Sequence, residues 1–186
     1  MDSIFVEFIE IFINQVIYLR GVYPKQIFRK HKAYSVPVYC SFYPPLNDYL
    51  KLSLQTLEEN NENKVINKVE IQIYNERRKE SFIIEVIKEL PTDENDKFLL
   101  SMNDMFRQAL LELELKFKSL VRLESPKFKI LLHTNEQGYN EINENAQQDF
   151  LWIKQEESIE DKKDLQSKNI IPIISLFSAK IYIIHT

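Results

Sequence analysis

The C-terminal strap, residues 135–186, is the stretch that most constrains how this chain can fold. Much of it is rich in Asn, Gln and Glu, and residues 156–168 are mostly charged, so it cannot bury enough apolar area to order by itself. Two apolar islands interrupt it: residues 150–153, which include the only tryptophan, Trp152, and the β-branched run at residues 170–184. This pattern predicts that the strap attaches to a surface formed earlier in the chain. A segment that attaches only after crossing a gap can enclose a ligand.

The length and composition of the chain indicate one globular unit. It has 186 residues, of which 44% are hydrophobic and 12% aromatic. This length suits one domain with one sizeable core, and the composition is typical of a folded protein. We therefore predict a single domain over residues 1–186, with a core at residues 1–134 followed by the strap.

Charge and residue usage exclude several classes of function. The formal net charge of −4 argues against a protein that grips nucleic acid with its whole surface, which needs a basic face. Two isolated glycines cannot form a Gly-rich phosphate loop. One cysteine allows no internal disulfide, and three scattered histidines show no metal-ligand spacing. We therefore expect neither a cofactor nor a metal.

Catalytic side chains are also not evident in the sequence. Cys40 could pair with His31 or His133, but it lies in an apolar stretch typical of an ordinary buried thiol. Glu112 and Glu114 would point to different sides of a helix, so they do not form an acid–base pair. The sequence predicts that the protein is not an enzyme.

The apolar N-terminal stretch is expected to be a core helix. Its polar residues recur at helical spacing: Ser3, Glu7, Glu10 and Asn14. This pattern predicts a helix over residues 3–20 with a narrow polar stripe, ended by Gly21 and Pro24. The same carboxylates and the lack of a basic start argue against a signal peptide or a membrane span. Together with the single cysteine, they favour a nuclear or cytoplasmic protein.

Residues 23–32 carry five basic side chains, namely Lys25, Arg29, Lys30, His31 and Lys32. The first interpretation is a solvated connection. The alternative is a patch that binds phosphate or an acidic partner.

The remaining periodicities predict an α+β domain with helices packed on an antiparallel sheet. Residues 34–40 are typical of a short strand, and a second helix is expected to begin at Pro44. Alternation at residues 65–88 predicts a hairpin in which one face of each strand is buried. A third, long helix follows with one apolar stripe, and Pro126 precedes a further strand at residues 128–132.

Seven short stretches resemble the HORMA-domain family, in the branch of accessory subunits of translesion DNA polymerase zeta (mitotic arrest deficient-like 2B type). They occur in the family's order along the whole chain: YLRGVYPKQIF at 18–28, YSVPV at 34–38, PLNDY at 45–49, LHT at 132–134, DFLWI at 149–153, IIP at 170–172 and IY at 181–182. The first two are the most specific to this branch. The resemblance implies a HORMA domain with three helices on an antiparallel sheet and a C-terminal "safety belt", which is the strap.

In this family the safety belt wraps a short partner peptide that adds a strand to the sheet, a β-augmentation. The resemblance implies a proline-containing peptide, because proline fixes an extended backbone at low entropic cost and packs on aromatic faces. Tyr49 and Trp152 match the family's proline-contacting aromatic residues, and we expect them to form the peptide site.

Two further surfaces are implied by the resemblance. The outer strands of the belt are expected to contact the C-terminal domain of the translesion deoxycytidyl transferase through Ile170, Lys180 and Tyr182. The family's dimer face lies on the long helix, where its arginine aligns with Gln108 rather than with the neighbouring Arg107. The resemblance therefore leaves homodimerisation open.

The function implied is a non-catalytic adaptor in translesion DNA synthesis. It would capture a proline-containing peptide of the polymerase zeta catalytic subunit and bridge it to the inserter polymerase. A HORMA-remodelling ATPase is a further expected partner, whereas direct nucleic-acid and membrane contacts are not expected. The alternative is a HORMA adaptor in spindle-checkpoint, meiotic-axis or double-strand-break repair signalling. Both interpretations imply DNA-damage or cell-cycle work in the nucleus.

Overall fold

The computed structural model describes residues 3–59, 66–86, 96–145, 152–155, 169–175 and 179–185. The helices are α1 (Ser3–Arg20), α2 (Pro44–Glu59), α3 (Asp96–Phe117) and α4 (Glu136–Asn145), with a 3₁₀ turn η1 (Lys25–Ile27). The strands are β1 (Phe28–Ala33), β2 (Val36–Ser41), β3 (Ile66–Tyr74), β4 (Lys79–Val86), β5 (Lys127–Thr134), β6 (Asn169–Ser175) and β7 (Ala179–His185). The predicted α+β class and the three long helices are confirmed.

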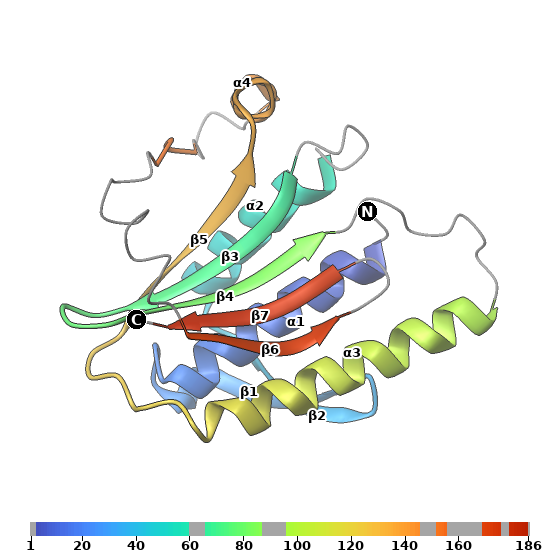
Figure 1. The fold of residues 1–186 in the computed structure, drawn as a ribbon, viewed down its shortest axis with the longest axis vertical. Coiled ribbons are helices and arrows are strands. Elements are labelled where there is room, and N and C mark those ends of the chain that lie inside the picture. Colours follow the sequence, from blue (N-terminus) through green and yellow to red (C-terminus); the bar gives the residue numbers. More distant parts are fainter. Residues whose placement is uncertain are drawn as a thin grey trace.

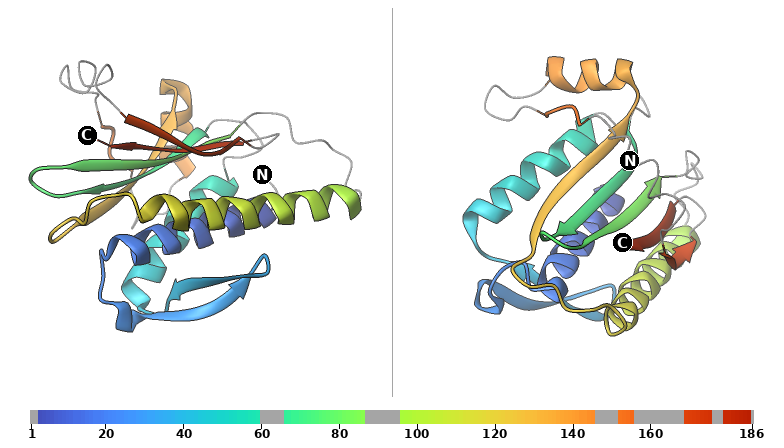
Figure 2. Two further views of the ribbon diagram at one scale, coloured as in Figure 1. Left: turned by 60° about the horizontal axis from the view of Figure 1, so that its bottom comes forward. Right: turned by 60° about the vertical axis from the view of Figure 1, so that its left-hand side comes forward.

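Five strands form one antiparallel sheet in the order β5-β3-β4-β7-β6 (Figure 1). The strands β1 and β2 form a separate hairpin. Helices α1, α2 and α3 cover one face of the large sheet, and the hairpin lies on the far side of α1 (Figure 2). The β6–β7 hairpin comes from the end of the strap, yet it joins the sheet next to β4 and not next to β5.

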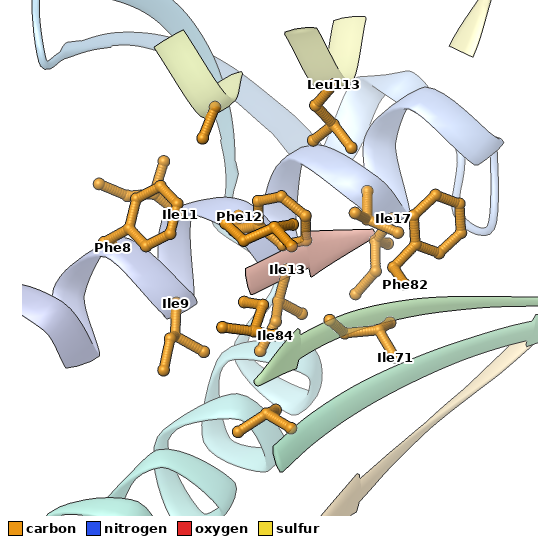
Figure 3. Packing of buried hydrophobic residues seen from close by; sticks show 14 of the residues in the cluster. Phe8, Ile9, Ile11, Phe12, Ile13, Ile17, Ile71, Phe82, Ile84 and Leu113 are labelled. Carbon is orange, nitrogen blue, oxygen red and sulfur yellow. The ribbon is translucent and has the colours of Figure 1, made fainter. Parts of the chain in front are cut away.

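Helix α1 is the centre of the core. Phe8, Ile9, Phe12 and Ile17 are fully buried and face residues from the sheet and from α3, among them Phe82 of β4 (Figure 3). Burying each such side chain contributes roughly 1.5–3 kcal/mol. Because the same cluster includes Ile142, Ile181 and Ile183, the strap shares the core of the preceding chain.

The end of α1 follows the sequence prediction. Gly21 has φ +65°, a left-handed conformation that glycine adopts without steric cost. Its N–H bonds the carbonyl of Tyr18, and the N–H of Val22 bonds the carbonyl of Ile17. These two bonds form a Schellman motif, which satisfies the last carbonyls of the helix.

The polar stripe predicted for α1 is wrong at Asn14. Glu7 and Glu10 are exposed, but Asn14 is 3% exposed. The Oδ1 atom of Asn14 accepts the N–H of Ser41, and Oε1 of Gln15 accepts the N–H of Tyr39. These side-chain amides accept hydrogen bonds from the edge of β2 that faces α1. They therefore satisfy backbone N–H groups inside the protein rather than facing solvent.

Residues 23–32 are mostly solvent-exposed, as predicted, but they are not an irregular connection. These residues form η1 and then β1, which pairs with β2 from Phe28 opposite Ser41 to Ala33 opposite Val36. The four residues Arg29 to Lys32 are exposed on both faces of the strand. Because polar and apolar residues do not alternate along β1, the sequence did not show the periodicity that predicts a strand.

The strap is more ordered at its start than its composition predicted. Residues 136–145 form α4, which buries Ile142. The predicted strand-like run at residues 170–184 forms β6 and β7, which pair with each other, and β7 pairs with β4. The charged stretch at residues 156–168 lies outside the described residues.

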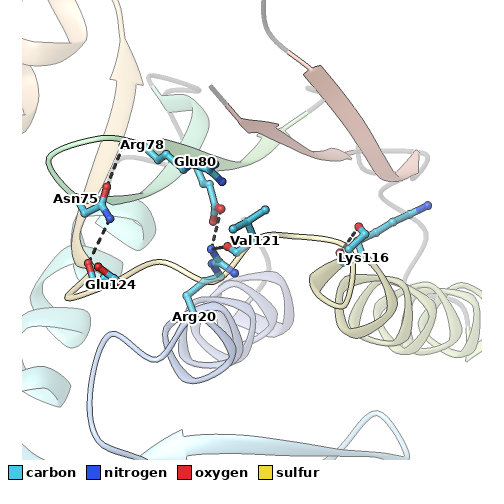
Figure 4. A network of polar contacts seen from close by, with 8 residues as sticks. Arg20, Asn75, Arg78, Glu80, Lys116, Val121 and Glu124 are labelled. Carbon is cyan, nitrogen blue, oxygen red and sulfur yellow. Dashed lines mark hydrogen bonds and ion pairs between the residues drawn. The ribbon is translucent and has the colours of Figure 1, made fainter.

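A network of polar contacts fixes the connection between α3 and β5 (Figure 4). The Nη2 atom of Arg20 lies 2.7 Å from Oε1 of Glu80 and donates to the carbonyl of Val121 at 2.8 Å. The amide of Asn75 donates to the carbonyl of Glu124 at 3.2 Å. This network holds the chain that leads into β5 against α1 and the β3–β4 turn, and so positions the start of the edge strand.

Candidate functional site

Strand β5 is an edge strand of the large sheet. One of its sides pairs with β3, and the other faces away from the sheet. Its inner edge pairs with β3, with Ile130 opposite Ile71. The N–H of Ile130 points outward, because it donates to the hydroxyl of Tyr49 at 3.4 Å. Backbone groups alternate along a strand, so those of Phe128 and Leu132 also point outward. Within the described residues no strand pairs with this edge, which therefore presents the groups that a further strand would bond.

Tyr49 lies on α2 beside this edge. Its ring meets the ring of Phe128 edge-on, with centroids 5.7 Å apart. The side chain is half-buried, and burial raises the pKa of the phenol. An aromatic surface therefore lines the edge near Ile130.

Trp152 fastens the strap to the same helix. Its indole Nε1 donates to Oγ1 of Thr56 at 3.1 Å, and its carbonyl accepts the hydroxyl of Tyr139 at 3.4 Å. Thr56 follows Tyr49 by seven residues, close to two helical turns, so both lie on one face of α2. The structure thus brings Tyr49 and Trp152 to the same side of α2, next to β5.

The attachment is narrower than the apolar island suggested. Nζ of Lys129 donates to Oε1 of Gln155 at 2.8 Å, which ties the strap to β5 as well. Ile153, however, is 91% exposed and anchors nothing. Phe150 and Leu151 lie outside the described residues. Within the apolar island, Trp152 is therefore the attachment point that the structure describes.

The second predicted surface lies on β7 and β6. Alternation along β7 places Ile181 and Ile183 in the core, with Lys180 and Tyr182 on the opposite face. The hydroxyl of Tyr182 donates to Oε1 of Glu85 at 2.5 Å, and burial raises the pKa of this phenol. Ile170 pairs with Ile184 in the backbone register. These residues are separated from Tyr49 by β3 and β4 in the sheet order.

A buried carboxylate lies on the same face of the sheet as Tyr182. Glu70 and Gln72 alternate with apolar residues in β3, which predicts a solvated position for both, but they are 7% and 4% exposed. Nε2 of His133 lies 2.7 Å from Oε2 of Glu70, and Nε2 of Gln72 donates to its Oε1 at 2.7 Å. Burial alone would raise the pKa of Glu70, but the hydrogen bonds from His133, Ser81 and Gln72 lower it to about 2.

The candidate dimer face lies on the exposed side of α3. Arg107 and Gln108 are both exposed there, as are Leu111 and Leu115. Self-association through this face stays open.

Comparisons with known proteins identify the relatives of the chain. No family model matches it. It is 27% identical over 160 residues to DNA polymerase zeta subunit 2 of Drosophila melanogaster. The match covers 82% of this chain and 79% of that protein. It is 29% identical over 180 residues to the mitotic spindle assembly checkpoint protein MAD2B of Rattus norvegicus. This match covers 92% of this chain and 82% of the relative.

Solved structures share the fold over nearly the whole length. A chain of the mitotic checkpoint complex superposes with a TM-score of 0.73 at 17% identity, covering 98% of this chain and 94% of that chain. Caenorhabditis elegans HTP-2 bound to the HIM-3 closure motif gives a TM-score of 0.64 at 12% identity, covering 97% and 87%. The chain has the HORMA fold and is similar in sequence to MAD2B and to DNA polymerase zeta subunit 2.

Three residues of this HORMA domain contribute contacts that sequence reasoning missed, namely Thr56, Tyr139 and Gln155. They are ordinary polar residues in no motif. The only available signal was the seven-residue spacing between Tyr49 and Thr56, which places Thr56 on the face of α2 that carries Tyr49.

The groups considered for catalysis are not assembled in the described part of this HORMA domain. Cys40 lies opposite Arg29 in the β1–β2 register, and burial raises the pKa of its thiol. His133 instead bonds Glu70. Among the described residues, no cluster of His, Cys, Asp and Glu could hold a metal ion, and no helix is long and apolar enough to cross a membrane.

Proposed function

We propose that this HORMA domain is a non-catalytic adaptor that captures a proline-containing peptide of the DNA polymerase zeta catalytic subunit beneath the strap. The similarity to DNA polymerase zeta subunit 2 and MAD2B supports the class of partner. The structure of HTP-2 bound to a closure motif supports peptide capture by this fold.

One observation carries the proposal. Residues 152–155 are attached to α2 and β5, whereas β6 and β7, which follow in sequence, join the sheet beyond β4. The strap therefore passes from one edge of the sheet to the other. A peptide that added a strand to the outer edge of β5 would lie beside the attached part of the strap, held by main-chain hydrogen bonds.

The side chains at this edge suit proline. Tyr49 and Phe128 offer aromatic surface beside the outward N–H of Ile130, and Trp152 lies along the same face of α2. A proline ring packs well against such surfaces and brings a backbone that is already extended. Capture would thus combine main-chain pairing with aromatic contacts.

The surface with Lys180, Tyr182 and Ile170 is proposed to receive the C-terminal domain of the translesion deoxycytidyl transferase. It lies on β6 and β7, away from the Tyr49 edge, so one molecule could hold both partners at once. This bridging role implies a nuclear location. Release of the peptide would require the strap to open, which is the expected task of a remodelling ATPase.

Affinity purification from its own cells, followed by mass spectrometry, tests the proposal. The tagged wild-type chain should recover the polymerase zeta catalytic subunit, and Trp152→Ala should lose it. Recovery of checkpoint or meiotic-axis proteins in its place would support the alternative adaptor role, which the checkpoint name of the MAD2B relatives favours. Recovery of the polymerase by both forms would contradict capture by the strap.

A further inference from the structure

An unbroken path of aromatic side chains leaves the Tyr49 end of the candidate site. Phe128 lies 5.7 Å from Tyr49, Tyr23 lies 6.1 Å from Phe128, and Tyr43 lies 6.3 Å from Tyr23, measured between ring centroids. The path joins β5 to the connection after α1 and to the residue before α2. It is therefore continuous with the edge at which the peptide is proposed to bind.

The far end of the path is open to solvent. Tyr43 is 41% exposed and Phe42, which precedes it in the chain, is 46% exposed, so two consecutive large aromatic side chains are exposed. Adjoining exposed apolar groups mark interaction sites more often than isolated ones do. The guanidinium of Arg29 lies 4.4 Å from the centroid of the Phe42 ring, which places a positive charge at this end.

The stretch of sequence that contains this end of the path is basic. Residues 18–57 contain one acidic residue, Asp48, although the whole chain is acidic. Five exposed cationic side chains belong to the same stretch: Lys25, Arg29, Lys30, Lys32 and Lys51. Within the described part of the chain, neither Arg29 nor Lys30 forms an ion pair. Basic residues on an edge strand also discourage aggregation, but that role does not require the exposed aromatic residues at the end of the path.

We propose that the peptide site continues along Phe128, Tyr23 and Tyr43 and that acidic residues flanking the captured peptide bind at Arg29, at the end of this path, and at Lys30, which follows it in β1. This inference rests on the proposed function, since it extends the same peptide. An extended chain covers about 3.4 Å per residue, so the three aromatic steps correspond to roughly five residues. The acidic residues should therefore begin about five positions from the residue that contacts Tyr49, on one flank only.

Selection from a peptide library tests this inference, because the library offers many flanking sequences at once. The probe is a displayed library of peptides about sixteen residues long, with a fixed central proline and random flanks. Wild-type protein should enrich Asp and Glu roughly twofold or more on one flank. The double variant Arg29→Glu/Lys30→Glu should lose that enrichment or enrich Lys and Arg. Lys118→Glu/Arg122→Glu is the matched control, since it changes the charge equally at exposed positions in the connection after α3, and should keep the acidic preference.

Affinities of the most enriched peptide, made synthetically, complete the test. The variant Arg29→Glu/Lys30→Glu should bind it roughly tenfold more weakly than the wild type, and the difference should shrink in high salt. Thermal melting of both variants checks folding.

Selection of proline peptides without acidic bias would overturn this inference and leave the proposed function standing. Failure to select any peptide would overturn both. Salt-sensitive oligo(dT) binding that the variant loses, without acidic bias, would make the basic strand a nucleic-acid surface and overturn the inference.

Discussion

The indole nitrogen of Trp152 donates a hydrogen bond to Oγ1 of Thr56, at 3.1 Å, and this bond joins the strap to α2. Around it the strap is polar, and Ile153 next to it is 91% exposed. Closing a long loop through so few contacts carries an entropic cost. A bound peptide that packs under Trp152 would offset that cost, so ordering of the strap and peptide binding should be coupled.

Replacement of Trp152 by alanine should therefore weaken peptide binding. Removing a tryptophan from the centre of an interface costs on the order of 2–4 kcal/mol, which is at least about 30-fold in affinity. Most of the loss should appear as a faster dissociation rate of the peptide, because the strap detaches from α2 more readily. Kinetics on an immobilised proline-containing peptide of the polymerase subunit measure this.

The hydrogen bond and the ring can be separated by a second substitution. Thr56→Val removes the acceptor but keeps the shape of the side chain. It should weaken the binding free energy of the peptide by about 0.5–1.5 kcal/mol. Wild-type affinity in Trp152→Ala, or full amide protection of residues 170–184 in the absence of peptide, would contradict the coupling between strap and ligand.

Substitution of Phe106 by alanine tests the core. Phe106 is 1% exposed and stacks on Phe8 of α1, with ring centroids 4.1 Å apart and an angle of 10° between the planes. Truncating a buried aromatic residue leaves a cavity and costs about 3–5 kcal/mol. Urea denaturation should show this loss in the free energy of unfolding. A loss below about 1 kcal/mol would mean that α3 does not pack through this residue.

The predictable parts of the fold are those in which one apolar period dominates. Helix α1 and its end at Gly21 follow from helical spacing and from glycine's access to positive φ. Strand β1 could not be predicted, because Arg29 to Lys32 are exposed on both of its faces. Asn14 looked like a surface residue, and only the fold shows that its side chain bonds the backbone of β2.

The candidate site was predictable only where a family resemblance supplied residues. Tyr49 and Trp152 came from matched stretches, and their placement beside one helix comes from the structure. Thr56 could not be predicted, because a lone threonine on a helix carries no signal until its partner is known. Likewise, Glu70 alternates with apolar residues as a surface carboxylate would, and its burial depends on neighbours from three strands.

Glu70 should make stability depend on pH. Its pKa in the folded protein is about 2, below the ordinary 4.5, so its contribution is fully present above pH 4.5 and is lost as the pH falls toward 2. At about 1.4 kcal/mol per pH unit this amounts to on the order of 3 kcal/mol. Urea denaturation across this range should therefore show a steeper loss for the wild type than for Glu70→Gln. Parallel curves would mean that His133 and Gln72 do not hold the carboxylate in solution.

The two predicted surfaces should be separable by mutation. Tyr49 lies beside β5, whereas Tyr182 lies on β7 and bonds Glu85, with β3 and β4 between them. Tyr49→Ala should weaken capture of the polymerase peptide and spare the transferase domain, and Tyr182→Ala should do the reverse. An aromatic side chain at an interface centre is worth on the order of 2 kcal/mol, or about 30-fold. Calorimetric titration of each variant with each partner measures both effects. Equal loss of both partners in both variants, with unchanged thermal stability, would show that the chain has one shared surface.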